Sequence, residues 1–139
     1  MKIKANLTQI AVVCEEITHK IGAKSHIIFL LDGDIGAGKT SLVSAFVRFC
    51  GVNESVTSPT FSLLHIYEEK IYHYDLYNKS LESLLDLGLL DLLENDGIHF
   101  IEWGNERLLN ILKEAYDNIS IIAISKIDNA RIYEFKEKF

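Results

Sequence analysis

The sequence predicts a three-layer α/β sandwich in which helices cover both faces of a mixed parallel and antiparallel sheet. Three observations support this fold class. Short apolar runs of strand length alternate with segments of helical periodicity, a glycine-rich turn joins one run to a helix, and two pairs of runs form predicted hairpins. The length of 139 residues suits one core, so residues 1–139 are expected to form a single domain.

The first part of the chain predicts a helix, a strand and a second helix. Asn6 or Thr8 would cap the first helix and Gly22 would end it. Its apolar positions at helical spacing are Leu7, Ile10, Cys14, Ile17 and Ile21. Residues 27–31 form a continuous apolar run, which is typical of a strand covered on both faces. The second helix is expected over about residues 39–50, with four inward side chains: Leu42, Val43, Phe46 and Phe49.

The second part of the chain predicts hairpins, helices and another buried strand. FSLLHIY and IYHYDLY flank Glu68, Glu69 and Lys70 and indicate a β-hairpin. SLESLLDLGLLDLL predicts a helix capped by Ser80 and weakened by Gly88, with leucines that face the core or, in part, a partner. Three further elements follow in order: the strand IHFIEW, the helix NERLLNILKEA, and the strand pair NISIIAI and RIYEF.

Charge and hydropathy exclude several classes of protein. Fourteen Lys and Arg against twenty Asp and Glu give a net charge of −6, which opposes unaided binding to tRNA or DNA. Any nucleic acid is therefore expected to be held by a partner. The apolar runs are too short to span a membrane, and the N-terminus lacks a signal-peptide core, so a cytoplasmic protein is expected. Cys14 and Cys50 are both expected to be buried structural thiols.

A phosphate-binding loop is the strongest motif. Gly33, Gly38, Lys39 and Thr40 satisfy G-x-x-x-x-G-K-[ST] between a predicted strand and a predicted helix, which indicates a P-loop NTPase-like fold. Lys39 is expected to reach the β- and γ-phosphates of ATP, and the Thr40 hydroxyl to ligate Mg²⁺. The expected nucleotide contacts are Gly33, Asp34, Ile35, Gly36, Ala37, Gly38, Lys39, Thr40 and Ser41. Ser41 would either touch the α-phosphate or be an ordinary first-turn residue.

Hydrolysis also requires carboxylates, and two of them follow buried strands. Asp75 ends IYHYD and Glu102 ends IHFIE, where ligands of open α/β sheets lie. Burying such carboxylates is costly without a cation, which Mg²⁺ with ATP would supply. TSPTF, at residues 57–61, is either a nucleotide-sensing switch segment or a turn before a strand.

Taken in order, GDIGAGKTSL, TSPTF, HYDLYN and IEW resemble the motifs of the bacterial TsaE family, also called YjeE. The resemblance implies an ATPase subunit that acts with the TsaB and TsaD proteins to make N6-threonylcarbamoyladenosine (t6A) in tRNA. In that family TsaD carries the transfer chemistry, and ATP hydrolysis by TsaE is associated with resetting the complex. The tRNA would then be contacted only indirectly, through the complex.

Carried over to this chain, the resemblance makes Lys39 and Thr40 the phosphate and metal contacts and Thr60 the switch residue. Asp75 and Glu102 become the catalytic acids. We expect Glu102 to hold Mg²⁺ opposite Thr40 and Asp75 to orient the attacking water, or the two roles to be exchanged. Two positions depart from the family pattern, namely Asn78 in place of Arg after H-x-D-x-Y and Asn105 in place of an acid after E-W.

Other readings of the motifs remain open. A small-molecule kinase would share the loop, but kinases use an arginine-bearing lid, and the only arginines are Arg48, Arg107 and Arg131. Residues 125–128, SKID, resemble a guanine-reading motif but fit a turn between strands as well. A nucleotide-gated docking protein with negligible hydrolysis is the non-enzymatic alternative. His73 either braces Asp75 or is simply packed or exposed. We expect slow ATP turnover that the partners stimulate.

Overall fold

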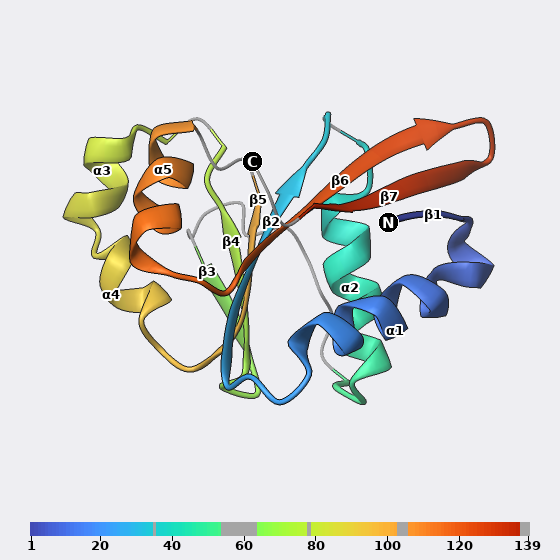
Figure 1. Ribbon diagram of the computed structural model, residues 1–139, viewed down its shortest axis with the longest axis horizontal. Coiled ribbons are helices and arrows are strands. Elements are labelled where there is room, and N and C mark those ends of the chain that lie inside the picture. The colour runs from blue at the N-terminus through green and yellow to red at the C-terminus, as the bar shows by residue number, and fades with distance from the viewer. Residues whose placement is uncertain (35, 54–63, 78, 103–105, 137–139) are drawn as a thin grey trace.

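The computed structural model describes residues 1–34, 36–53, 64–77, 79–102 and 106–136. Its centre is a seven-stranded sheet with helices on both faces (Figure 1). The strands are β1 (Lys2–Ala5), β2 (His26–Asp32), β3 (Leu64–Tyr67), β4 (Ile71–Asp75), β5 (Gly97–Glu102), β6 (Ile119–Ile127) and β7 (Ala130–Lys136). A 3₁₀ turn, η1 (Leu7–Gln9), precedes the helices α1 (Ile10–Ile21), α2 (Lys39–Phe49), α3 (Leu81–Asp86), α4 (Leu89–Leu93) and α5 (Glu106–Ala115).

The strand order is β1-β7-β6-β2-β5-β4-β3. β6, β2, β5 and β4 are parallel, whereas β1-β7-β6 and β4-β3 are antiparallel pairs. The sequence-based prediction of a mixed sheet is therefore confirmed. Since parallel strands end at the same edge of a sheet, the residues that follow β2, β4 and β5 gather at one edge.

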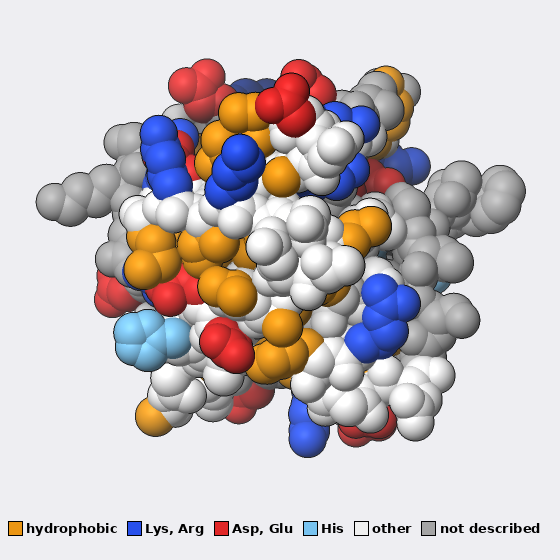
Figure 2. All heavy atoms as spheres, turned by 90° about the vertical axis from the view of Figure 1, so that its right-hand side faces the viewer, with side chains coloured by type: hydrophobic (Ala, Val, Ile, Leu, Met, Phe, Trp, Pro, Cys, Tyr) orange, Lys and Arg blue, Asp and Glu red, His pale blue; other side chains and the backbone are white. Residues whose placement is uncertain are grey.

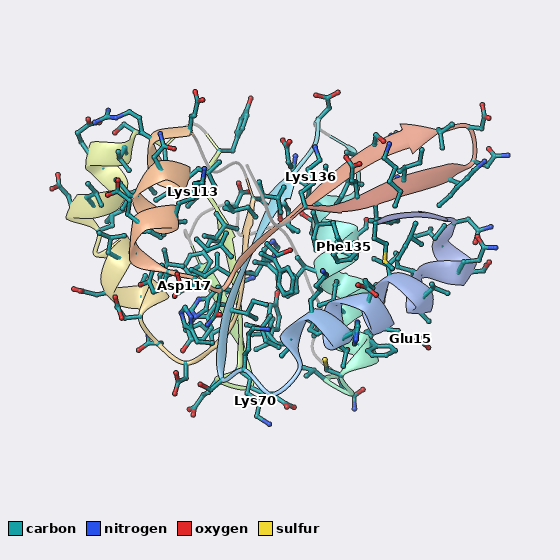
Figure 3. All side chains as sticks on the ribbon, viewed as in Figure 1. Glu15, Lys70, Lys113, Asp117, Phe135 and Lys136 are labelled. Carbon is teal, nitrogen blue, oxygen red and sulfur yellow. The ribbon has the colours of Figure 1, made fainter. Side chains whose placement is uncertain are left out.

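Two apolar layers hold the helices against the sheet. α1 and α2 cover one face, and α3, α4 and α5 cover the other (Figure 1). The first layer includes the buried side chains Val13, Ile17, Phe29, Phe46 and Phe100. The second includes Leu84, Leu89, Ile101, Leu108 and Leu112. Figure 3 shows side chains crowding both layers, while Lys70, in the turn between β3 and β4, lies at the rim of the molecule.

The leucine-rich segment after β4 forms two short helices in place of the single one predicted. Ser80 caps α3 by accepting a hydrogen bond from the Ser83 N–H at 3.1 Å, as expected. Gly88 then adopts a left-handed conformation with φ of 82°, which ends α3 and starts α4. Leucines from both helices reach the core, but Leu85 and Leu87 are exposed. The segment is thus mainly a core element.

The structure corrects several predictions about individual side chains. Leu7 is exposed because it lies in the 3₁₀ turn capped by Asn6, outside the apolar stripe of α1. Cys14 is buried, whereas Cys50 is exposed because it follows the last residue of α2. Phe49 is also exposed, although its ring stacks on that of Phe46 with centroids 6.4 Å apart. The strand β1 was not predicted.

The face of the molecule shown in Figure 2 is mixed in character. The end of the molecule in Figure 2 shows Lys and Arg, Asp and Glu, and hydrophobic side chains interspersed, without one basic face. Of the helices in the described ranges, none combines the length and the apolar composition needed to cross a membrane.

A buried histidine joins the strands on the face covered by α3 to α5. His99 is fully buried in β5, and its Nε2–H donates to the Asn95 carbonyl at 2.8 Å. Its Nδ1 therefore accepts from the Tyr74 hydroxyl at 2.7 Å, and its ring stacks on that of Tyr72. Burial is the main reason that the pKa of His99 is lowered to about 4, and the neighbouring His26 acts in the same direction.

This lowered pKa predicts a loss of stability in mild acid. Above the unfolded-state pKa of His99, near 6.5, the neutral ring contributes its full stability. As the pH falls from 6.5 towards 4, the unfolded state gains a proton that the folded state resists, so up to about 3 kcal/mol of the free energy of unfolding is lost. Urea unfolding of wild type and His99→Gln across this range measures the effect. The difference in free energy of unfolding between the two proteins should become smaller as the pH falls. A difference that stays constant over this pH range would contradict the prediction.

Candidate nucleotide-binding site

The glycine-rich loop connects the end of β2 to the first residue of α2. Gly36 and Gly38 have φ values of 78° and 112°, in the left-handed region that favours glycine. Gly33 is required for a different reason, since a Cβ there would lie 2.6 Å from the Ile124 carbonyl oxygen of β6. The Ala37 N–H donates to the Asp34 carbonyl at 3.0 Å and closes the turn. The loop is therefore packed tightly against the neighbouring strand.

The β6–β7 hairpin also borders this loop. The Arg131 Nε–H donates to the Ala37 carbonyl at 2.5 Å. A Cβ on Gly38 would lie 2.7 Å from the same nitrogen, and one on Gly36 would lie 3.7 Å from Lys126 Nζ. Two cationic side chains from the end of the chain thus lie beside the loop. Sequence reasoning missed them because no local pattern connects residues so far apart.

Lys39 is buried, and its ammonium group donates to backbone carbonyls of the loop itself. Its partners are the carbonyl oxygens of Gly33 and Asp34, the latter at 3.3 Å. Burial lowers the pKa of Lys39, since the charged form loses hydration. Four carboxylates act in the opposite direction, those of Glu102, Asp32, Asp34 and Asp75. The lysine thus lies in an acidic environment at the start of α2.

Glu102 is a buried carboxylate at the end of β5 and lies beside Thr40. The Thr40 hydroxyl donates to Glu102 Oε2 at 3.0 Å and lies 3.4 Å from Oε1. His73, from the neighbouring strand β4, donates from Nε2 to the same Oε2. Only 3% of Glu102 is exposed, so these hydrogen bonds offset the cost of burying it. His73 thus contacts Glu102, and the structure describes no contact in which it braces Asp75.

Asp75 lies in register with Glu102 on the adjacent parallel strand. Register partners in a parallel pair point to the same face, so both carboxylates belong to the face covered by α1 and α2. Asp75 is half-buried, and its Oδ1 accepts a hydrogen bond from the Tyr77 N–H at 3.1 Å. The structure thereby brings Thr40, Glu102 and Asp75 to one edge of the sheet.

Some residues of the predicted site and of the family motifs lie outside the described residues. These are Ile35, the TSPTF segment with Thr60, Asn78, Trp103 and Asn105. Ser41 is described and exposed in the first turn of α2. Together with Thr40, Ser44 and Arg48 it lines an open hollow of about 380 Å³, which Leu7 and Ile10 also line. This hollow offers space beside the loop for a ligand larger than phosphate.

The oxygen ligands fit a magnesium ion that is shared with phosphates. Within the described ranges, no group of three or more His, Cys, Asp and Glu side chains could form a metal cage. Mg²⁺ does not need such a cage, because it is usually held by one or two carboxylates, phosphate oxygens and waters. A hydroxyl and a carboxylate 3.0 Å apart, Thr40 and Glu102, supply hard oxygen ligands of the required kind.

Together, the β2–loop–α2 unit, the lysine and threonine at the start of α2, and the acid at the end of β5 define a P-loop nucleotide-binding protein. The family model that matches the sequence is described as "Threonylcarbamoyl adenosine biosynthesis protein TsaE" and covers residues 5–132. The chain belongs to the TsaE family.

Individual relatives agree with this assignment. Three proteins named "tRNA threonylcarbamoyladenosine biosynthesis protein TsaE" are 42% (Rickettsia conorii), 33% (Bacillus subtilis) and 37% (Haemophilus influenzae) identical to this chain. The alignments cover 68%, 77% and 86% of this chain and 61%, 74% and 75% of those proteins, respectively. For the Rickettsia conorii relative, the match thus spans less than two thirds of its length.

A solved structure has the same fold. The crystal structure of Bacillus subtilis YdiB superposes with a TM-score of 0.63 at 22% identity. The match covers 97% of this chain and 84% of the YdiB chain.

Gly33→Ala tests the packing of the loop. The added methyl group would meet the Ile124 carbonyl, so the loop must shift, and we expect ADP affinity to fall at least about tenfold. Gly88→Ala is the control, because its φ of 82° also disfavours alanine, but no atom lies within 4 Å of the added Cβ. It should cost about 1 kcal/mol of stability and leave ADP affinity unchanged. Calorimetric titration with ADP measures the affinity of each variant. Equal ADP affinities in Gly33→Ala and Gly88→Ala would contradict the prediction.

Proposed function

We propose that the protein is a Mg²⁺-dependent ATPase subunit of the machinery that makes t6A in tRNA, and that it acts with TsaD and TsaB. Membership of the TsaE family supports the pathway. The observation that carries the chemistry is the hydrogen bond from the Thr40 hydroxyl to the buried Glu102 carboxylate, beside the phosphate loop. In P-loop NTPases a hydroxyl and an acid in these positions hold the metal.

Each residue of the loop has a part in binding. The N–H groups of residues 33–38 and the N-terminus of α2 would hold the β-phosphate, and Ser41 would approach the α-phosphate. Lys39 would contact the β- and γ-phosphates, and Thr60 would respond to the γ-phosphate. Thr40 and Glu102 would hold Mg²⁺, which when bound neutralises charge on the phosphates.

Asp75 is proposed to orient the water that attacks the γ-phosphate. It lies in register with Glu102, and the Tyr77 N–H fixes one of its oxygens. Fixing the carboxylate in this way positions an acceptor for the proton of the water. In the alternative mechanism the two roles are exchanged, with Asp75 at the metal and Glu102 at the water. A nucleotide-bound structure would distinguish the two mechanisms, because it would show which carboxylate contacts Mg²⁺.

Turnover is proposed to be slow in the isolated protein and to rise with TsaD and TsaB. Phosphoryl transfer needs cations that face the transferred group, and Arg131 beside the loop is engaged by the Ala37 carbonyl. The net charge of −6 disfavours direct binding of tRNA, so the partners would hold it. Because the complex would modify tRNA, we propose that the protein is located in the cytoplasm.

Alanine variants of the two acids test the proposal. With TsaD and TsaB present, Asp75→Ala and Glu102→Ala should each lower ATP turnover at least about a hundredfold, because each removes a metal contact or the water-orienting group. Asp91→Ala, an exposed acid of α4, is the control and should keep wild-type turnover. ADP binding in EDTA should stay within about threefold in all variants. If both acid variants keep wild-type turnover, the assignment of Asp75 and Glu102 to hydrolysis fails. If the wild type itself turns over no ATP above background with the partners present, a nucleotide-gated docking protein is favoured.

A further inference from the structure

His73 is a buried polar residue that the proposed chemistry does not yet use. It lies in β4 with none of its surface exposed, so its ring does not face the open space where a nucleotide would bind. In the sheet it is in register with His65 of β3 and Phe100 of β5. Any effect of His73 on the site must therefore pass through another side chain.

Its contact identifies that side chain. Nε2 of His73 hydrogen-bonds to Oε2 of Glu102. A carboxylate accepts hydrogen bonds, so Nε2 carries the hydrogen in this pair. Nδ1 is buried and has no hydrogen-bond partner among the residues that the structure describes. The hydrogen bond to Glu102 is thus the one polar contact described for a fully buried imidazole.

The second neighbour of Glu102 cannot fix it alone. The terminal torsion of a glutamate is broad, and the hydroxyl of Thr40 is itself a rotor, so a hydrogen bond between them leaves the carboxylate plane variable. The ring of His73, by contrast, is fully buried and projects from a strand that is paired on both sides, to β3 and to β5. Mg²⁺ requires near-ideal octahedral geometry, which makes the orientation of a ligating carboxylate important.

We propose that His73 is a positioning residue for the metal site, whose Nε2–H holds one oxygen of Glu102 and so fixes the carboxylate plane beside Thr40. This inference rests on the proposed role of Glu102 at Mg²⁺. Residues that orient a metal ligand in this way typically change metal affinity or activity by ten- to a hundredfold when they are replaced.

The readout is the ratio of two affinities for a non-hydrolysable ATP analogue, one in saturating Mg²⁺ and one in excess EDTA. This ratio measures the coupling between metal and nucleotide on the protein and requires no turnover. His73→Leu removes the donor and should lower the ratio about tenfold or more, with affinity in EDTA unchanged. His73→Gln keeps an N–H donor and should stay within about threefold of wild type.

His99→Leu is the matched control. His99 is equally buried, but it lies on the opposite face and bonds to Tyr74 and Asn95. We expect this variant to have a lower melting temperature and a wild-type ratio. The proposal is overturned if His73→Leu keeps the wild-type ratio, or if the Leu and Gln variants lose it equally. Failure of the proposed function looks different, because wild type itself would then show no gain in affinity from Mg²⁺.

Discussion

Burial of one carboxylate constrains the whole site. Glu102 lies at the end of a central strand with almost none of its surface exposed, and an unpaired charge there would cost several kcal/mol. It is tolerated because donors reach it from two other elements, Thr40 from α2 and His73 from β4. The requirement to pair this charge therefore fixes the start of α2 against β4 and β5. The proposed site for Mg²⁺ would use the same arrangement that pairs this buried charge.

The two faces of the sheet use buried histidines in different ways. His99 has both ring nitrogens paired, to the Tyr74 hydroxyl and to the Asn95 carbonyl, and lies on the face opposite Glu102. His73 has a single described hydrogen-bond partner, and that partner is Glu102, the acid proposed to hold the metal. Because neighbouring residues of a strand point to opposite faces, the sheet separates the hydrogen bonds of His99 from those of Glu102.

Features formed by residues that are close in sequence could be predicted, and most contacts between distant residues could not. The loop unit was predictable because the motif, the buried strand and the helix lie within a few residues of one another. The placement of Asp75 beside Glu102 followed from the rule that parallel strands end together. The partner of His73 was not predictable, since alternation assigns a side chain to a face but not to a neighbour. The sequence predicted one helix weakened at Gly88, whereas the structure has two helices separated there. Helix propensity gives the energetic cost of a glycine in a helix but not the left-handed conformation that it adopts.

The hydrogen bond from Arg131 to the Ala37 carbonyl joins segments that are 94 residues apart in sequence. Contacts of such separation form late, because closing the intervening chain costs entropy before any interaction compensates for it. On the ribosome, β2 and α2 emerge well before the final hairpin does. A nascent chain can therefore contain every residue of the glycine motif and still lack Arg131, whose hydrogen bond to the Ala37 carbonyl holds the loop. That contact can form only after β7 has been synthesised.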